Sequence, residues 1–302
     1  MTSKPVPDQP VPDTQNDYRG GSVAAVVVTY RRPDGLQRSL RALGEQERPL
    51  QRIYVIDNGG DIAELEQDNP LVRIIRPGSN TGPAGGFALG LQAASDEGFD
   101  WAYLLNDDDR PRPHAVGTLL AQAVAPQGQS RLVMGWVNLS GQIIPTGARW
   151  HRGLQPPPPA DHDTPYDVDV ITFGGLLVPT QVVREIGVPR ADFFMMWEEY
   201  EYCLRARQHG YTITVVPTPL VDIDGLPPGS RSAPWRAYYE ARNSSVTISN
   251  FGDFTHRWWW IKRQTKLALA SCLAADRWPR LRFRLRGIVD GTRGRMGRVV
   301  QP

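Results

Sequence analysis

The sequence has few of the features that mark secreted, zinc-binding or membrane-spanning proteins. Its 302 residues include two cysteines, Cys203 and Cys272, which are too few and too far apart for a disulfide framework or a zinc site. No run reaches the ~20 apolar residues that cross a bilayer, and residues 1–12 lack the basic, apolar and small-residue order of a signal peptide. We therefore expect a cytoplasmic protein whose cysteines are packing thiols.

The chain as a whole also lacks an excess of charge, since its net charge is +2. The charge is nevertheless unevenly distributed. Residues 256–302 contain twelve Lys and Arg against two Asp, a net charge of +10 that leaves −8 for the first 255 residues. An asymmetry of this size predicts an anionic partner for the C-terminal segment.

The order of apolar runs predicts one large α/β domain. Residues 1–21 are rich in Pro, Asp and Gln and have little to bury, so a disordered N-terminal tail is expected there. Beyond them, apolar runs alternate with helical patterns, which is typical of a single Rossmann-like, mostly parallel sheet flanked by helices. The runs lie at 23–30, 52–58, 71–75 and 101–106. We expect the catalytic domain to cover 22–250 and a basic amphipathic helical segment to cover 251–302.

Three consecutive carboxylates, Asp107, Asp108 and Asp109, end the fourth run. Like charges so close together need a counter-ion, and hard oxygen ligands suit Mg²⁺ or Mn²⁺ bridging to a diphosphate. Alternate residues of an extended segment point the same way, so we expect Asp107 and Asp109 to act together and Asp108 to point elsewhere. The alternative interpretation is a solvated turn, or the N-cap of the helix predicted near Pro113.

The chain lacks the glycine fingerprint of a dinucleotide-binding protein. Its glycine cluster at 82–86 follows the third run instead of the first and is not G-x-G-x-x-G. Ligands of parallel sheets bind at the carboxyl ends of the strands, and polar residues that fall there predict a ligand site at this edge. They are Tyr30, Asp57, Asn80 and Asp107.

A second acidic cluster, Glu198, Glu199 and Glu201, follows an aromatic run that ends at Trp197. The cluster begins a predicted helix. Acidic residues in a first helical turn complement the helix dipole, so two of the three glutamates could serve only to start the helix. Glu201 and Arg205 are four residues apart and are predicted to pair.

In this order the motifs resemble the inverting glycosyltransferases of family 2, which have the GT-A fold. The matching stretches are 28–33, 55–59, 80–86, 106–109 and 197–199 with Arg205. Within the family, residues 80–87, Trp197 and 238–243 resemble galactofuranosyltransferases and rhamnosyltransferases of bacterial envelope polymers. The resemblance implies transfer of galactofuranose or rhamnose, with inversion, from a UDP- or dTDP-sugar to a hydroxyl of a lipid-linked or cell-envelope glycan.

The resemblance also assigns residues to the donor and the metal. Six residues are implied to bind the donor, with Asp57 orienting the base: Thr29, Arg31, Asp57, Asn80, Gly82 and Asp107. Asp107 and Asp109 are implied to hold Mg²⁺ or Mn²⁺. Related galactofuranosyl enzymes place a histidine ligand after the strand that reads 211–216 here, where this chain offers Asp222 and Asp224. We expect Asp224 to be the ligand; the alternative is that both are turn residues before Gly225.

On the acceptor side, the resemblance implies that Glu199 deprotonates the acceptor hydroxyl opposite the leaving group, with Glu198 beside it. Trp197 is assigned to the acceptor. Gly174 and Gly175 join it, because paired glycines within an apolar run indicate that something approaches the backbone closely.

Two alternatives remain open. A nucleotidyltransferase shares the parallel sheet and the carboxylate-bound metal but releases pyrophosphate. A non-catalytic nucleotide-sugar or nucleic-acid binding protein is suggested by the basic C-terminus and the tryptophans at 258–260. A binder does not need this set of carboxylates, so no nucleic-acid partner is expected.

The last segment, 256–300, mixes Trp and Leu with twelve cations and is too polar to span a bilayer. This pattern suits helices that lie in the interface of an anionic membrane, here the inner face of the plasma membrane. The alternative is that the apolar residues pack on the catalytic domain while the arginines form a solvated face.

Overall fold

The computed structural model describes residues 20–60, 62, 69–124, 128–159, 162–223, 233–272 and 276–301. All but the last two residues of the tail expected at 1–21 lie outside these ranges, as does Asp224.

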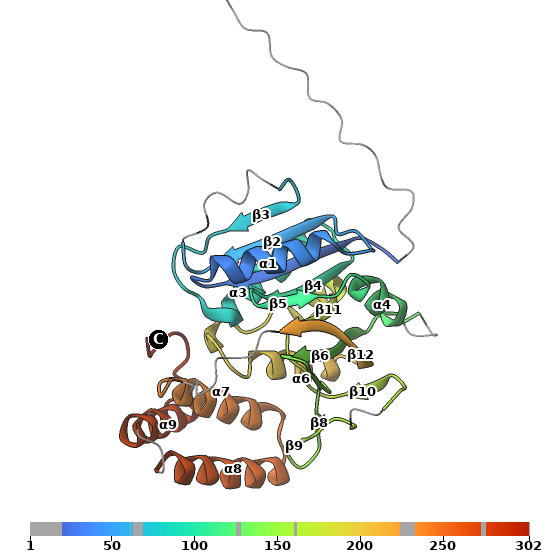
Figure 1. Ribbon diagram of the computed structural model, residues 1–302. Coiled ribbons are helices and arrows are strands. Elements are labelled where there is room, and N and C mark those ends of the chain that lie inside the picture. The colour runs from blue at the N-terminus through green and yellow to red at the C-terminus, as the bar shows by residue number, and fades with distance from the viewer. Residues whose placement is uncertain are drawn as a thin grey trace, which may run out of the picture.

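A ten-stranded sheet forms the centre of the molecule, in the order β10-β12-β6-β11-β4-β1-β2-β3, with β5 beside β12 and β7 beside β6 (Figure 1). Four neighbouring strands run parallel: β1 (Val23–Thr29), β2 (Arg52–Asp57), β3 (Val72–Ile75) and β4 (Trp101–Asn106). All seven residues of β1 are buried, because helices cover both faces of the sheet. The predicted α/β class with a mostly parallel sheet is confirmed.

The other half of the sheet is mixed. Its strands are β5 (Asp109–Pro111), β6 (Leu132–Leu139), β7 (Gln142–Ile144), β10 (Tyr166–Val168), β11 (Leu176–Pro179) and β12 (Ile213–Ile223). β11 lies antiparallel between β4 and β6, whereas β6 and β12 are parallel. A separate hairpin joins β8 (Arg149–Trp150) to β9 (Leu154–Gln155).

Helices cover the two faces of the sheet with separate cores. α1 (Pro33–Gly44) and α4 (Ala115–Gln122) pack on one face, and Leu36 and Leu43 of α1 are buried at helical spacing. α3 (Gly82–Asp96), α5 (Thr180–Ile186) and α6 (Glu198–Gln208) cover the other face. The first residues of α3 and α6 therefore lie near the strand ends where the site forms.

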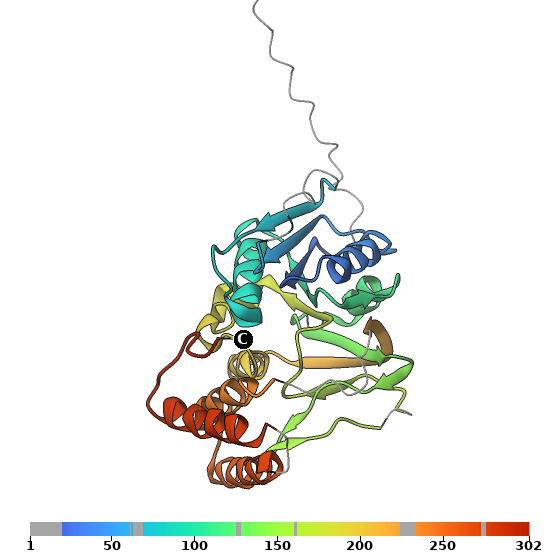
Figure 2. The same ribbon diagram turned by 60° about the vertical axis from the view of Figure 1, so that its left-hand side comes forward.

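Three C-terminal helices stack away from the sheet (Figures 1 and 2): α7 (Arg236–Phe251), α8 (Phe254–Cys272) and α9 (Arg277–Thr292). Glu240 of α7 joins them, since it is paired with Arg263 of α8 and with Arg284 of α9. The predicted helical C-terminal region is thus present and packed. None of the helices within the described ranges combines the length and the apolar character needed to cross a membrane.

After α9 the chain returns to the sheet domain, and its end lies beside α3 (Figure 1). The backbone N–H of Gly297 donates to the carbonyl of Asp192 over 2.7 Å, next to the short helix η1 (Ala191–Phe193). Arg298 donates to the carbonyl of Asn80 over 3.3 Å, and Val300 is buried. This return places C-terminal residues at the rim of the site.

Candidate active site

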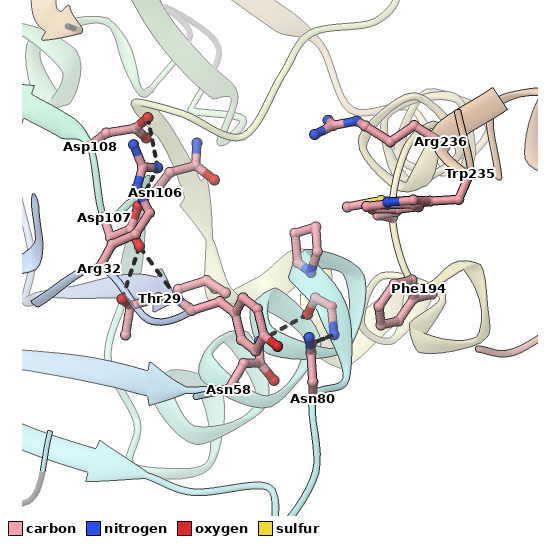
Figure 3. A pocket seen from close by; sticks show the side chains of 15 residues that line it. Thr29, Arg32, Asn58, Asn80, Asn106, Asp107, Asp108, Phe194, Trp235 and Arg236 are labelled. Atoms are coloured by element: carbon pink, nitrogen blue, oxygen red, sulfur yellow. Dashed lines mark hydrogen bonds and ion pairs between the residues drawn. The ribbon is translucent and has the colours of Figure 1, made fainter. Parts of the chain in front are cut away.

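A cleft with two adjoining compartments lies at the carboxyl ends of β1, β2 and β4. The first compartment has a volume of about 450 Å³ and is lined by Val28, Thr29, Tyr30, Arg32, Asn58, Asn80, Gly82, Pro83, Asn106, Asp107, Asp108, Phe194, Met195, Trp235 and Arg236 (Figure 3). The second has a volume of about 400 Å³ and is lined by Pro83, Phe87, Asn106, Leu154, Met195, Met196, Trp197, Glu198, Glu199, Tyr200, Arg236, Glu240 and Arg263. The shared residues show that the two compartments are continuous.

Asp107 is the most fully partnered carboxylate of the first compartment. Its Oδ2 accepts from the hydroxyl of Thr29 at 2.9 Å and from the N–H of Tyr30 at 3.4 Å, and its Oδ1 accepts from Arg32 at 3.0 Å. Arg32 also donates to Asp108 at 3.0 Å, as Figure 3 shows. Burial raises the pKa of Asp107, but Arg32 and Thr29 act in the opposite direction. Asp107, which was expected at the carboxyl end of its strand, follows β4 there and lies beside Thr29 of β1.

Asp109 does not point with Asp107, so that part of the prediction is wrong. Asp107 and Asp108 form a turn after β4, and the alternation of side chains holds only within extended backbone. Asp108 consequently shares Arg32 with Asp107, while Oδ2 of Asp109 folds back to accept from the N–H of Asn106 at 2.6 Å and from its amide at 3.0 Å. Burial raises the pKa of Asp109 to about 7, and its Oδ1 has no hydrogen-bond partner.

Gly174 and Gly175 are approached closely, as expected, but by the protein itself. A Cβ on Gly174 would lie 2.8 Å from Oδ2 of Asp109, and a Cβ on Gly175, which has a φ of +97°, would lie 2.7 Å from Cγ2 of Val221. Neither glycine lines a compartment. Their part in acceptor binding stays a prediction.

Asp57 ends β2 and is buried, but it does not line either compartment. Its Oδ1 accepts from the N–H groups of Gly59 and Gly60 at 3.0 and 2.7 Å. Its Oδ2 lies 3.8 Å from Arg76 and has no hydrogen-bond partner, so it retains the capacity to accept from a ligand. The neighbouring Asn58 lines the compartment instead.

Asn58, Asn80 and Gly82 connect β2 to the start of α3. Oδ1 of Asn58 accepts from the backbone and hydroxyl of Thr81, both at 2.9 Å, and Oδ1 of Asn80 accepts from the N–H of Gly82 at 2.8 Å. Gly82 has a φ of +69°, and a Cβ there would lie 2.0 Å from the carbonyl oxygen of Phe194. Only glycine fits this contact.

Arg31, which was expected beside the nucleotide, does not line the compartment. Its guanidinium lies over the ring of Tyr30, with 5.1 Å to the centroid, and it is exposed. Its neighbour Arg32 lines the compartment instead. The motif at 28–33 contains both arginines, and the sequence alone did not distinguish them.

Glu198 and Glu199 begin α6 in the second compartment, next to the buried Trp197. Oε1 of Glu199 accepts from the N–H of Phe173 at 3.1 Å, and burial raises the pKa of Glu199 to about 7. Burial and the charge of Glu199 raise the pKa of Glu198, whose Oε2 has no hydrogen-bond partner. A carboxylate with a pKa near neutrality is suited to accept a proton from a hydroxyl.

Glu201 takes a different role from its two neighbours. Its Oε1 and Oε2 accept from Arg205 at 3.1 and 3.0 Å, which confirms the predicted pair. Arg205 also donates to the carbonyl of Val188 at 2.9 Å. Glu201 lines neither compartment, so among the three glutamates only Glu198 and Glu199 face the cleft.

Residues 24–136 match the family described as Glycosyl transferase family 2. This part of the chain is a family 2 glycosyltransferase domain. The chain is 43% identical over 108 residues to galactofuranosyltransferase GlfT1 of Mycobacterium tuberculosis (strain CDC 1551 / Oshkosh), which covers 34% of this chain and 36% of the relative. It is 30% identical over 199 residues to GlfT1 of Mycolicibacterium smegmatis, covering 62% and 66%. The aligned parts thus span from about a third to nearly two thirds of these relatives.

Solved structures extend the likeness over most of the chain. The crystal structure of GalNAc-T7 with UDP, GalNAc and Mn²⁺ superposes with a TM-score of 0.63 at 16% identity and covers 90% of this chain and 56% of that one. TarS 1–349 of S. aureus gives 0.58 at 13% identity and covers 89% and 80%. These likenesses confirm the predicted GT-A fold of the family 2 domain.

The residues that the family resemblance assigns to a metal ion lie in different surroundings. Asp109 offers a buried carboxylate oxygen without a partner, and Asp107 lies two residues away. Asp222 is engaged elsewhere, since it accepts from Arg112 at 3.0 and 3.2 Å and from Asn138 at 2.5 Å. Asp224 lies outside the described residues. Within the described ranges no group of three or more His, Cys, Asp and Glu is placed to hold a metal, so a metal here would depend on the carboxylate of Asp107, which lines the first compartment, and on oxygens of a bound ligand.

The segment between the compartments, 193–197, carries backbone strain. Phe194, Met196 and Trp197 have φ values of +65°, +67° and +71°, in a region that non-glycine residues avoid at a cost of about 1–3 kcal/mol each. The carboxylates Glu198 and Glu199 follow at once. Strain of this kind persists only where surrounding contacts determine the backbone.

Asn243 and Arg242 of α7 supply those contacts. The amide of Asn243 donates to the carbonyls of Phe193, Met195 and Met196 at 3.0, 2.8 and 2.8 Å. Arg242 is fully buried and donates to the side chain of Asn243, to the carbonyl of Phe193 and to that of Gly297. In the sequence, the motif at 238–243 indicated only a family resemblance. In the structure, its Arg242 and Asn243 hold the backbone of the segment that leads into α6.

Proposed function

We propose that this protein transfers a sugar from a UDP- or dTDP-sugar to an acceptor hydroxyl with inversion at the anomeric carbon. The observation that carries the proposal is the pair of compartments. One is lined by Asp107 and Asp108, which follow the parallel strand β4, and the adjoining one contains Glu199 with its raised pKa. Similarity to the GlfT1 proteins favours galactofuranose over rhamnose, and a cell-envelope or lipid-linked glycan as acceptor.

The nucleotide would lie in the first compartment. Asp57, whose Oδ2 has no hydrogen-bond partner but lies 3.8 Å from Arg76, would accept from the base, and the start of α3 at Asn80 and Gly82 forms the wall on that side. Thr29 keeps Asp107 oriented. Asp107 would hold Mg²⁺ or Mn²⁺, which when bound neutralises charge on the diphosphate. Asp109 would join it after turning away from Asn106, which binds its Oδ2 in this structure. A third protein ligand at Asp224 remains part of the proposal.

The acceptor would lie in the second compartment, against Trp197. Its hydroxyl loses a proton to Glu199, the acceptor oxygen forms a bond to the anomeric carbon, and the bond from that carbon to the phosphate oxygen breaks with its electron pair on the phosphate. Glu198 precedes Glu199 on α6, and burial and the charge of Glu199 raise its pKa.

The test is an assay of the purified full chain with UDP-galactofuranose and dTDP-rhamnose, with Mg²⁺, with Mn²⁺ and with a chelator. We expect release of the nucleoside diphosphate and transfer of the sugar to a glycan acceptor. Release of pyrophosphate would identify a nucleotidyltransferase. No turnover with any donor or metal, together with salt-sensitive nucleic-acid binding, would favour a non-catalytic binding protein.

We also propose that α8 and α9 rest on an anionic membrane at the inner face of the plasma membrane. Phe254, Trp258, Ile261 and Leu269 recur at helical spacing on the exposed side of α8. Exposed cations flank this stripe at Arg257, Lys262 and Lys266. The opposite side of α8 packs inward, where Trp260 donates to Ser244 at 2.8 Å. Apolar side chains bordered by cations suit the interface of an anionic leaflet.

Vesicle sedimentation tests this surface with the intact chain. We expect binding to phosphatidylglycerol-containing vesicles, weaker binding at high salt, and loss of binding in Trp258→Ser/Leu269→Ser. Ile143→Ser, which changes an exposed apolar residue of β7, is the matched control and should bind normally. Equal binding by both variants would remove α8 from the interaction.

A further inference from the structure

Arg236 stands apart from the residues that the family resemblance assigns. It is the first residue of α7, and it lines both compartments. Figure 3 shows its guanidinium extending into the cleft from the wall opposite Asp107 and Asp108, next to Trp235. Its position in the cleft results from the packing of α7, more than 120 residues after the carboxylates in the sequence.

The other lining arginines are committed to carboxylates. Arg32 is paired with Asp107 and Asp108, and Arg263 is paired with Glu240. The guanidinium of Arg236 forms no hydrogen bond or ion pair with any residue that the structure describes, and it is exposed to the cleft. An unpaired cation between two carboxylate-lined compartments is thus available to an anion that enters between them.

The anion that would enter is a diphosphate, given the proposed function. The sugar must reach Glu199 in the second compartment while the nucleotide stays in the first, so the diphosphate spans the shared wall where Arg236 lies. A guanidinium is always charged, and its planar set of donors matches two phosphate oxygens at once. Without this cation, the carboxylates that line the two compartments would repel the diphosphate.

We propose that Arg236 binds the β-phosphate of the donor and stabilises the nucleoside diphosphate as it leaves. This inference rests on the proposed function and adds a protein cation to the electrostatics of the reaction. When the bond from the anomeric carbon to the phosphate oxygen breaks, the electron pair remains on that oxygen, and Arg236 donates to it. A donor aimed at developing charge acts mainly on the transition state.

Calorimetric titration of the full chain with UDP and with uridine tests the assignment. We expect Arg236→Ala to weaken UDP binding at least about tenfold, because charge-assisted hydrogen bonds to the phosphate are lost. Uridine, which lacks the phosphates, should bind as it does to the unaltered protein. Arg236→Lys keeps the positive charge but lacks the paired donors, so its affinity for UDP should lie between that of the unaltered protein and that of Arg236→Ala. With saturating donor, kcat of Arg236→Ala should fall roughly 10²-fold.

Arg41→Ala is the matched control, since Arg41 is exposed on α1 and lines neither compartment. It should leave UDP affinity unchanged. Arg236→Ala with unaltered UDP affinity, or with equal losses for UDP and uridine, would overturn the assignment while leaving the transferase proposal intact. If the unaltered protein binds neither UDP nor dTDP, the proposed function fails and this assignment fails with it.

Discussion

The two compartments hold their carboxylates in opposite ways. In the first, Asp107 accepts from a hydroxyl, a backbone N–H and a guanidinium, and Asp108 shares that guanidinium. In the second, Glu199 accepts from one backbone N–H, and one oxygen of Glu198 has no partner. Burial raises the pKa of both Asp107 and Glu199, but in the first compartment Arg32 and Thr29 oppose that rise, whereas a single backbone N–H opposes it in the second, where the pKa of Glu199 reaches about 7.

This difference fits two tasks in one transfer reaction. In the first compartment, the negative charge of Asp107 after β4 suits a site where a metal cation binds a diphosphate. In the second, the raised pKa of Glu199 suits a site where an acceptor hydroxyl loses its proton. The five predictions below test whether the division of labour holds.

The largest effect should come from Glu199→Gln. The amide keeps the shape of the side chain but cannot accept the proton, so kcat should fall at least about 10²-fold, the usual contribution of a general base. Donor affinity, measured by calorimetry with UDP, should not change because Glu199 lies in the second compartment. Near-normal turnover would move the role to Glu198.

Gly82→Ala should instead damage the first compartment. The new Cβ would meet the carbonyl oxygen of Phe194 at 2.0 Å with a φ of +69°, so α3 or the segment at 193–197 must shift. We expect the donor KM to rise at least about tenfold and the melting temperature to fall. Gly98→Ala is the control, because Gly98 has a φ of +80° with nothing within 4 Å of its Cβ position. Equal effects of the two variants would show that the loss comes from the positive φ of the glycine and not from the contact with the carbonyl oxygen of Phe194.

Asn243→Ala acts on the boundary between the compartments. Without the amide, three backbone carbonyls of the strained segment lose their donor, and Glu198 and Glu199 are no longer held in place. We expect kcat to fall about tenfold with a smaller change in the KM for the donor, since misplacement of a base affects the chemical step. A uniform loss in kcat, donor affinity and melting temperature would indicate general destabilisation instead.

The sequence predicted those parts of the site that lie on regular elements. Asp57 and Asp107 follow apolar strands, and Glu199 begins a helix, so their places could be derived from strand ends and helix starts. The orientation of Asp109 could not, because a turn at 107–108 breaks the alternation on which the prediction depended. Local patterns locate residues on an element but do not show where its backbone bends.

The residues that the sequence did not identify reach the cleft through tertiary packing. Arg236 and Trp235 come from the start of α7, and Asn243 supports the strained segment from the same helix. No sequence motif connects these residues to Asp107 or Glu199, because their contacts with the cleft depend on how α7 packs against α6. In the sequence, the only indication that this helix matters for the site was the family resemblance at 238–243.

The pH dependence of turnover should report on the second compartment. Glu199 must be ionised to act as a base, so the rate should rise with pH through about 7, where burial places its pKa. At pH 6 about one tenth of the carboxyl is ionised, and kcat should be about tenfold below its plateau. Steady-state rates from pH 5 to 9 measure this limb. A limb near pH 4.5, the ordinary value of the group, would show that burial does not control the base.

Glu201→Gln should have the smallest effect on turnover, although Glu201 lies only two residues from Glu199. Its carboxylate is bound by Arg205 and does not face the cleft. Removing its charge weakens two charge-assisted hydrogen bonds, so the free energy of unfolding should fall by about 1–2 kcal/mol while kcat stays within about threefold. Denaturant unfolding measured beside the rate separates the two outcomes. A loss of kcat as large as that of Glu199→Gln, with unchanged stability, would mean that the base belongs to the whole acidic cluster and that the two compartments do not differ as their hydrogen bonds indicate.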